Sequence, residues 1–355
     1  MTQAQTATAL SFPPPPPGSR QPASSRPALT LEPCRPDRQA EWLDFLERSN
    51  NGTLFHDLRF LAYHPPQRFD THHLLFCRER KLLALLPAAV VVEPDGLRVL
   101  KSPYGASVGG PVLPCGLTAA EALELVGRLQ AHAEDQHLDG IELRIGPSVY
   151  LREPNTLLDF ALMARGFRLV RRWLLHVVPL DGPPADPIER RLSKAKRYDV
   201  RAALKKGAQP REAGAEDLPA FYELLLESQR QHNARPTHTL AELQDLFARV
   251  PGRIRLFLCR HGNAEIAGVL LFVLNPRVAY TFYICGRPGE AGVAGPAVLL
   301  THIMQRLAGE GFCYLDLGPS SFDDFSLNGG VAFFKESMGG QGFCRDTCLL
   351  YTSDA

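Results

Sequence analysis

The feature that most constrains the fold is an order of secondary-structure patterns that occurs twice along the chain. In the second half, apolar periodicity predicts helices at residues 217–231 and 239–249, strands at 253–260, 265–274 and 277–285, a helix at 295–309 and a strand at 312–317. The first half repeats this order in outline. We therefore expect an α+β chain of two tandem domains with one fold, each a mixed and mostly antiparallel sheet flanked by helices.

The first domain is expected between an N-terminal stretch and a later stretch, both of which are richer in proline than the domain itself. Helical spacing near Trp42 is followed by predicted strands at 72–77, 81–92 and 97–101, a helix at 118–137, a strand at 141–145, a helix at 156–164 and a strand at 169–180. The first three strands are expected to form an antiparallel meander. Prolines and a glycine in the segment 181–187 mark a boundary, so we place the two domains at residues 37–182 and 183–347.

Both ends of the sequence differ from the rest. The first 36 residues hold nine of the 30 prolines and lack apolar periodicity, which predicts a disordered, proline-rich tail at residues 1–36. The segment 348–355 resembles a translated transposon-end adapter from sequencing libraries. We expect it to be an artefact, with the natural chain continuing past Thr347.

The composition narrows the classes of partner. The 39 basic and 38 acidic side chains nearly cancel, so the whole chain has no electrostatic reason to coat DNA or an anionic membrane. The longest apolar stretch, residues 82–92, contains Pro87 and is much shorter than a membrane-spanning helix. The sequence supports neither insertion into a membrane as an integral protein nor a secretory signal. We therefore expect a cytoplasmic protein.

The cysteines and histidines show no metal-binding pattern. None of the eight cysteines forms a C-x-x-C pair, which favours free thiols over zinc ligands or disulfides. His72, His73 and His232 also lack the spacing of metal ligands. No metal cofactor is therefore expected.

One strongly basic segment stands out at residues 188–206, where the spacing predicts an amphipathic helix. Arg191, Lys194 and Arg197 would lie one helical turn apart, where the two domains meet. They are candidate ligands for phosphate on a nucleotide-linked precursor or on the acceptor end of a charged tRNA. The alternative is a solvated polar face that binds nothing.

Several short segments together resemble one protein family. They are Phe-Phe-Lys-Glu-Ser-Met-Gly-Gly at 333–340, Tyr-Leu-Asp-Leu-Gly at 314–318, the basic segment 191–207, Ser-Pro-Tyr-Gly-Ala-Ser-Val-Gly-Gly at 102–110 and Ile-Glu-Leu-Arg-Ile-Gly-Pro at 141–147. Their order and spacing resemble the Fem-type branch of the GNAT acyltransferase superfamily. The resemblance implies tandem GNAT-like domains. It further implies either aminoacyl-tRNA-dependent peptidyl transfer, as in enzymes that build peptidoglycan cross-bridges, or acyl-CoA-dependent N-acyl transfer.

The resemblance also implies a catalytic lysine. In the Fem-type pattern, the lysine of Phe-Lys-x-x-(Phe or Met)-Gly lies where both substrates meet, and Lys335 occupies that position in the segment 334–339. An ammonium there can stabilise an oxyanion or the leaving oxygen of the donor. A surface lysine beside Glu336 is the alternative.

Asp316 and two tyrosines are further candidates for the catalytic site. Asp316 can accept or position a proton of the attacking amine, or it can cap the turn at residues 318–319. Side chains alternate along the strand 277–285, so one of Tyr280 and Tyr283 is expected in the core. The other, which we take to be Tyr283, is expected to face the substrate.

The glycine-rich segment 102–110 supplies two candidates for substrate binding, Tyr104 and Gly109. Glycines in this segment permit close approach of the backbone to a ligand. Turn geometry alone is the alternative explanation.

A coenzyme A donor needs a cradle for its pyrophosphate. In GNAT enzymes, an (Arg/Gln)-x-x-Gly-x-(Gly/Ala) loop at a helix start supplies it through free backbone N–H groups. Gly295 and Ala297 match this pattern, and Val298 follows them, but Gly292 replaces the expected Arg or Gln and Pro296 lacks an N–H. Acyl-CoA, in particular acetyl-CoA, is thus a candidate cofactor, and a simple glycine-rich turn is the alternative.

The function expected from these observations is acyl transfer by an enzyme. It would join an activated acyl or aminoacyl group to an amine of a peptidoglycan or polysaccharide precursor of the cell envelope, by N-acyl transfer of the GNAT type. Aminoacyl-tRNA-dependent peptidyl transfer is one alternative. A non-catalytic binding module on the same fold is another.

Overall fold

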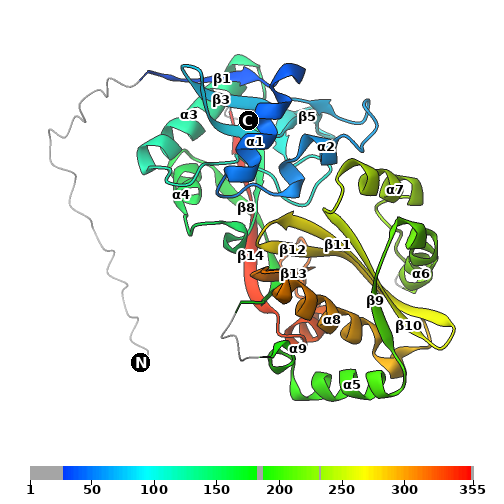
Figure 1. Ribbon diagram of the computed structural model, residues 1–355. Helices are drawn as coiled ribbons and strands as arrows, with labels where there is room; N and C mark the ends of the chain where they lie inside the picture. Colours follow the sequence, from blue (N-terminus) through cyan, green and yellow to red (C-terminus); the bar gives the residue numbers. More distant parts are fainter. Residues whose placement is uncertain (1–26, 182–186, 232, 353–355) are drawn as a thin grey trace, which may run out of the picture.

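The computed structural model describes residues 27–181, 187–231 and 233–352. The first domain lies above the second in Figure 1, and the strands β8 and β14 run between them. Two tandem α+β domains are thus confirmed. The expected tail falls largely outside the described residues, as do residues 182–186 at the expected boundary and residues 353–355.

The first domain contains helices and strands in nearly the expected order. They are β1 (Leu29–Pro33), α1 (Gln39–Arg48), α2 (Leu58–Leu61), β2 (Asp70–Thr71), β3 (Leu74–Arg78), β4 (Lys81–Leu86), β5 (Ala89–Val92), β6 (Arg98–Ser102), α3 (Ala119–Asp135), β7 (Gly140–Ile145), α4 (Leu157–Ala164) and β8 (Arg168–Pro179). Helix α3 begins with a capping box: the Thr118 hydroxyl accepts from the Glu121 N–H, and the Glu121 carboxylate accepts from the Thr118 N–H.

The second domain agrees with the sequence prediction within a few residues from residue 217 to residue 317. Its elements are α5 (Lys194–Lys205), β9 (Gln209–Ala213), α6 (Leu218–Arg230), α7 (Leu240–Arg249), β10 (Ile254–His261), β11 (Ala264–Asn275), β12 (Val278–Gly286), α8 (Gly295–Gly309), β13 (Tyr314–Pro319), α9 (Gly329–Ser337) and β14 (Gln341–Tyr351). A second capping box, Thr239 with Glu242, begins α7.

One sheet of 11 strands extends through both domains, in the order β2-β5-β6-β7-β14-β8-β13-β12-β11-β10-β9, and β1, β3 and β4 form a separate sheet. The neighbouring strands are antiparallel except for two pairs, β6 with β7 and β12 with β13. These parallel pairs occupy corresponding places in the two domains, each with a helix, α3 or α8, as the crossover. The repeated order in the sequence therefore produces a repeated topology.

The two domains exchange their last strands. Strand β14, which ends the second domain, pairs with β7 of the first domain, while β8, which ends the first domain, pairs with β13 of the second. Strands β8 and β14 also pair with each other from Gln341–Val177 to Leu349–Arg168. Each domain's sheet is thus continued by a strand from the other domain.

Three boundaries expected from the sequence need correction in the first domain and at the C-terminal end. Residues 29–33 do not belong to the tail, because β1 pairs with β3 and Leu29 is buried. The segment 81–92 is two strands in two different sheets, since Pro87 separates β4 from β5, and the expected meander is therefore split. Residues 348–351 lie inside β14, paired with β7, so only their expected origin as an adapter stays a prediction.

The basic segment 188–206 is also not one helix. A 3₁₀ turn covers Ile188–Arg191, the chain is extended at Leu192, and α5 begins at Lys194. The reason is local: the Ser193 hydroxyl accepts from the Lys196 N–H at 3.2 Å and so caps a new helix start.

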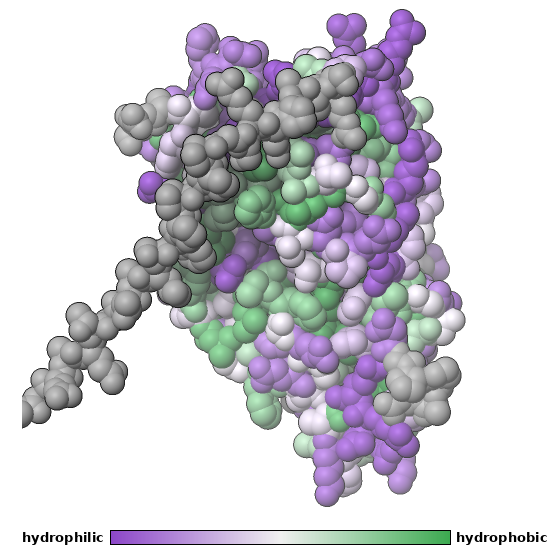
Figure 2. Space-filling view, turned by 90° about the vertical axis from the view of Figure 1, so that its left-hand side faces the viewer, coloured by the Kyte–Doolittle hydropathy of each residue, from purple (hydrophilic) through white to green (hydrophobic). Residues whose placement is uncertain are grey.

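An apolar core joins the two domains. Phe55 and Phe60 of the first domain pack edge to face on Phe272 of β11, with ring centroids 6.1 and 5.7 Å apart, and Phe55 also contacts Tyr280. On the face of the molecule drawn in Figure 2, hydrophobic and hydrophilic side chains meet in a hollow near the middle.

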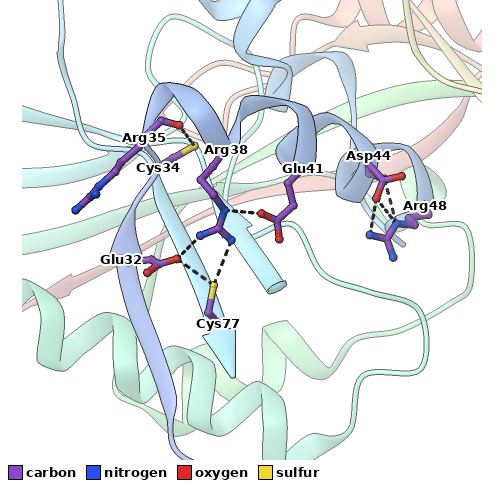
Figure 3. Close-up of polar contacts among 8 residues, drawn as sticks. All are labelled: Glu32, Cys34, Arg35, Arg38, Glu41, Asp44, Arg48 and Cys77. Atoms are coloured by element: carbon purple, nitrogen blue, oxygen red, sulfur yellow. Dashed lines mark hydrogen bonds and ion pairs between the residues drawn. The ribbon is translucent and has the colours of Figure 1, made fainter. Parts of the chain in front are cut away.

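Arg38 ties the first strand to the first helix (Figure 3). Its guanidinium lies 2.5 Å from Glu32 of β1 and 2.5 Å from Glu41 of α1, and 3.8 Å from the Cys77 sulfur of β3. The eight cysteines are free, as expected, and burial raises the pKa of the Cys77 thiol. This cluster fastens β1 and gives no sign of a reactive thiol.

Candidate active site

A cleft of about 1390 Å³ lies between the two domains. First-domain side chains in its wall include Tyr63, Tyr104, Arg144, Arg171 and Trp173, and the second domain supplies Thr237, His238, Phe282, Asp323 and Arg345. An interdomain cleft with aromatic walls and a few charged groups is the usual setting of a ligand site.

Cations gather around one indole in this cleft. The guanidinium carbons of Arg144, Arg171 and Arg345 lie 4.6, 5.4 and 4.5 Å from the Trp173 ring centroid. Asp323 accepts a hydrogen bond from the Trp173 Nε1 at 2.8 Å and lies 3.6 Å from Arg171. The exchanged strands position this group, because Trp173 lies on β8 and Arg345 on β14.

The wall of the cleft also contains a histidine between two tyrosines. His238 lies 3.1 Å from the Tyr283 hydroxyl through Nδ1 and 3.1 Å from the Tyr63 hydroxyl through Nε2. Burial lowers the pKa of His238 to about 4, so the imidazole is neutral at pH 7 and bridges the two phenols. Tyr283, expected to face the substrate, is therefore engaged with His238.

The two tyrosines of β12 do not lie on opposite faces, which corrects the expected alternation. Tyr283 pairs with Leu270 but Thr281 pairs with Leu271, so Phe282 is an additional residue in a β-bulge. Tyr280, Phe282 and Tyr283 consequently belong to one apolar cluster. Tyr280, rather than Tyr283, lies beside Asp316 and Arg345.

Asp316 is fully buried on β13 and both of its carboxylate oxygens accept hydrogen bonds. The Tyr150 hydroxyl donates to Oδ2 at 2.5 Å, and the Gly318 N–H donates to Oδ1 at 2.6 Å. Burial raises the pKa of Asp316, while these hydrogen bonds and the charges of Arg345 and Lys335 oppose the rise. The bond to Gly318 is the turn-capping arrangement.

Lys335 is a second cation whose charge acts on Asp316, besides Arg345. It lies on α9, is 6% exposed, and its Nζ donates to the Pro319 carbonyl at 2.7 Å. Burial lowers the pKa of Lys335 to about 8, and the Asp316 charge limits the shift. The surface-lysine alternative is therefore excluded, and the catalytic role of Lys335 stays a prediction.

The basic residues of the segment 188–206 do not reach the cleft, which corrects their expected place at the domain junction. Helix α5 packs against α8 at the end of the second domain farthest from the first (Figure 1). Arg191 is separated from Lys194 and Arg197 by the break in the helix, and its guanidinium donates to the Leu180 and Asp181 carbonyls. However, the Ser193 N–H donates to the Ser337 carbonyl at 2.9 Å, so α5 begins beside the end of α9.

Tyr104 and Gly109 lie in different cavities. Tyr104 lines the interdomain cleft, and its hydroxyl lies 3.2 Å from His73 Nε2. Gly109 lines a separate cavity of about 1090 Å³ inside the first domain. A Cβ on Gly109 would lie 2.5 Å from the Pro103 nitrogen, so packing of the turn accounts for this glycine.

The residues at the start of α8 do not fit a pyrophosphate cradle. The N–H groups of Ala297 and Val298 donate to the Ala294 carbonyl at 3.0 and 3.1 Å, and Pro296 has no N–H. Gly295, Ala297 and Val298 are buried, and a Cβ on Gly295 would lie 3.0 Å from Ala267. This helix start therefore offers a pyrophosphate few free donors.

Arg144, Trp173, Arg345, Tyr150 and His238 were not identified as site residues from the sequence. A local signal existed for one of them: alternation along the strand containing Arg171 and Trp173 places a cation and an indole on one face. For Arg345 and Tyr150 the decisive contacts join distant segments, so no local pattern indicates them.

The comparisons with known proteins bear on the family. Residues 194–330 match the family model described as an acetyltransferase (GNAT) domain. The match runs from the start of α5 to the start of α9, within the second domain. No curated protein matches its sequence.

Solved structures show that the fold of this chain resembles those of FemX and of a tandem GNAT protein. The crystal structure of FemX matches with a TM-score of 0.69 at 12% identity, over 89% of this chain and 96% of that chain. L-PGS from Bacillus licheniformis gives 0.56 at 15% identity, over 91% and 94% of the two chains. A tandem GNAT protein from the clavulanic acid biosynthesis pathway gives 0.51 at 12% identity, over 92% and 99%. The expected fold class, two tandem GNAT-like domains, is confirmed.

None of the helices in the described residues is long and apolar enough to cross a membrane. Within the same residues, no group of three or more His, Cys, Asp or Glu side chains is arranged to hold a metal ion.

Proposed function

We propose that this protein transfers an activated aminoacyl or acyl group to an amine of a cell-envelope precursor, and that charged tRNA is the donor. The observation that carries the proposal is Lys335, a buried lysine held beside Asp316 in a GNAT fold. Its helix α9 ends beside the start of α5, the basic helix, and Asp316 also faces the charge of Arg345, which lines the interdomain cleft where we place the acceptor.

The chemistry asked of these residues is modest, because an aminoacyl ester is already activated. The amine attacks the ester carbonyl, so that the C–N bond forms and the carbonyl oxygen becomes an oxyanion. When the oxyanion collapses, the C–O bond to the carrier breaks and the proton lost by the amine passes to the leaving oxygen. The Lys335 ammonium stabilises the oxyanion or the leaving oxygen. Asp316, whose two oxygens accept from Tyr150 and Gly318, holds the charge of Lys335 in place and is a poor candidate for the proton acceptor.

Two observations favour charged tRNA over acyl-CoA. The start of α8 offers few free N–H groups to a pyrophosphate. In addition, α5 presents Lys194, Arg197 and Arg201 together with Tyr198, which is 74% exposed, and none of these three cations forms an ion pair with a residue that the structure describes. Cations beside an exposed aromatic ring suit a nucleic acid.

The test measures the melting temperature of the protein in the presence of charged tRNA, of uncharged tRNA and of acetyl-CoA. We expect tRNA to stabilise the protein and acetyl-CoA to have no effect. The double variant Lys194→Glu/Arg197→Glu should lose the tRNA effect, most strongly at low salt. Arg128→Glu, an exposed position on α3 of the first domain, is the matched control and should keep it.

If acetyl-CoA alone stabilised the protein, acyl-CoA-dependent N-acyl transfer would be the better description of its function. If neither donor stabilised the protein and no transfer to an amine were detected, the non-catalytic binding module would be the better description.

A further inference from the structure

The interdomain cleft contains two guanidinium groups without an ion pair among the described residues, that of Arg345, which is buried, and that of Arg144, which is half-buried. Arg345 is 7% exposed, and neither it nor Arg144 forms an ion pair with any residue that the structure describes. The Nε atoms of both are buried and have no hydrogen-bond partner among those residues. Both groups lie over the Trp173 ring, within 4.6 Å of its centroid.

The nearby carboxylates are engaged with other groups. Asp316, whose charge acts on Arg345, accepts from the Tyr150 hydroxyl and the Gly318 N–H. Asp323 accepts from the Trp173 Nε1 and lies 3.6 Å from Arg171. Glu142 lies 3.7 Å from Lys101. The cationic side chains lining the cleft, Arg68, Lys101, Arg144, Arg171 and Arg345, therefore exceed its acidic ones, Glu142 and Asp323.

Two like charges buried on one indole are costly unless an anion joins them. Burial, with the charge of Arg345, lowers the pKa of Arg144 to about 10, which still leaves it charged at pH 7. One carboxylate suits a single guanidinium fork, whereas two forks suit a group with more oxygens. A phosphate meets this requirement.

We propose that Arg144 and Arg345, packed on Trp173, form a subsite for a phosphate or diphosphate group of the acceptor substrate. That the anion belongs to the acceptor substrate rests on the proposed function. The anion-binding site itself is inferred only from the side chains of the cleft. The subsite takes over only the binding of precursor phosphate that the sequence suggested for Arg191, Lys194 and Arg197, and the proposed contact of Lys194 and Arg197 with tRNA is unaffected.

Binding is measured on the full chain with inorganic phosphate, pyrophosphate and acetate at constant ionic strength. Isothermal titration calorimetry needs no substitution. Fluorescence of Trp173 can be isolated with Trp42→Phe, because the sequence has two tryptophans. We expect saturable binding of pyrophosphate and phosphate, with a change in Trp173 emission, and at least tenfold weaker binding of acetate.

The variants Arg144→Gln and Arg345→Gln should each weaken pyrophosphate binding at least tenfold. Arg68→Gln is the matched control, because Arg68 lines the same cleft but is exposed, and it should change binding less than twofold. Without anion, Arg144→Gln should melt at a temperature equal to or above that of the wild type, because a buried unpaired charge is removed. Arg345→Lys, which keeps the charge near Asp316, serves if Arg345→Gln fails to fold, and it should also bind less tightly.

Absence of saturable binding by the wild type would overturn the subsite, as would wild-type affinity in both Arg144→Gln and Arg345→Gln. Equal affinity for acetate and phosphate would overturn the assignment to phosphate. These measurements use neither donor nor turnover, so a failed subsite leaves the transfer assay unaffected. Conversely, anion binding without any amine transfer would contradict the proposed function alone.

Discussion

The Tyr150 hydroxyl donates a 2.5 Å hydrogen bond to the Asp316 carboxylate and so joins the two domains inside the core. Tyr150 follows β7 in the first domain, and Asp316 lies on β13 of the second. Burial raises the pKa values of both groups. The bond therefore connects the interface between the domains to the charge that faces Lys335.

Tyr150→Phe should lower the free energy of unfolding by about 1–3 kcal/mol at pH 7, because a buried carboxylate loses a donor. The folded-state pKa of Asp316, already raised, should rise further. Since a protonated carboxyl needs this donor less, the destabilisation should shrink as the pH falls through that pKa. Urea unfolding at several pH values measures this.

Tyr222→Phe is the control for that experiment. The Tyr222 hydroxyl donates to the His238 backbone carbonyl at 3.2 Å and touches no carboxylate. Its loss should cost less and should not depend on pH in the same way. Equal, pH-independent losses for both variants would contradict the role assigned to the Tyr150–Asp316 bond.

Lys335→Ala should lower kcat/KM for amine transfer by about 10²-fold or more, which is roughly 2.7 kcal/mol of transition-state stabilisation. The melting temperature should change little or rise, because burial makes the charged lysine unfavourable. Steady-state kinetics and thermal melts separate the two effects. Lys81→Ala, an exposed lysine at the start of β4, is the control.

The pH profile provides a second test of Lys335. If the ammonium form acts, the rate should fall as the pH rises through about 8, the pKa of Lys335 in the fold. Lys335→Arg should keep part of the rate and lose this alkaline decline, because arginine stays protonated. An unchanged decline in Lys335→Arg would assign it to another group.

The same pKa predicts how stability depends on pH. The pKa of Lys335 is about 8 in the fold and 10.5 in an ordinary lysine, so the unfolded chain binds more protons between these values. Its contribution should therefore make the protein more stable as the pH rises from about 8 to about 10.5. Lys335→Met should remove this contribution in denaturant unfolding.

Two N-terminal deletions distinguish the tail from the fold. Removing residues 1–26, which lack apolar periodicity, should change the free energy of unfolding by less than about 0.5 kcal/mol. Removing residues 1–35 also removes β1 and its buried Leu29, and should cost about 2 kcal/mol or more. Equal stability of the two truncated proteins would contradict a structural role for β1.

Much of the fold follows from local patterns in the sequence. Thr118 and Thr239 each precede a glutamate by three residues, and both helices begin there. Local patterns fail where a single residue interrupts a run: Pro87 divides one apolar segment between two sheets, and Ser193 starts a new helix inside a basic one. The bulge at Phe282 likewise places Tyr280 and Tyr283 on one face.

The candidate site is harder to predict from the sequence, because its contacts join segments that are distant along the chain. Asp316 and Lys335 are indicated by their own surroundings in the sequence, but Tyr150 lies 166 residues from Asp316. Arg345 and Trp173 meet only because β14 and β8 are neighbours. No periodicity within either strand predicts that pairing.

The exchange of β8 and β14 limits how the cleft can change its width. A hinge between the domains would have to break backbone hydrogen bonds in a sheet that is continuous through both strands. The cleft therefore keeps a nearly constant width and does not open and close by a hinge motion of the two domains. Substrates of different size must be admitted by side chains and by loops at its mouth, such as the turn where Gly105 has a φ of 58°.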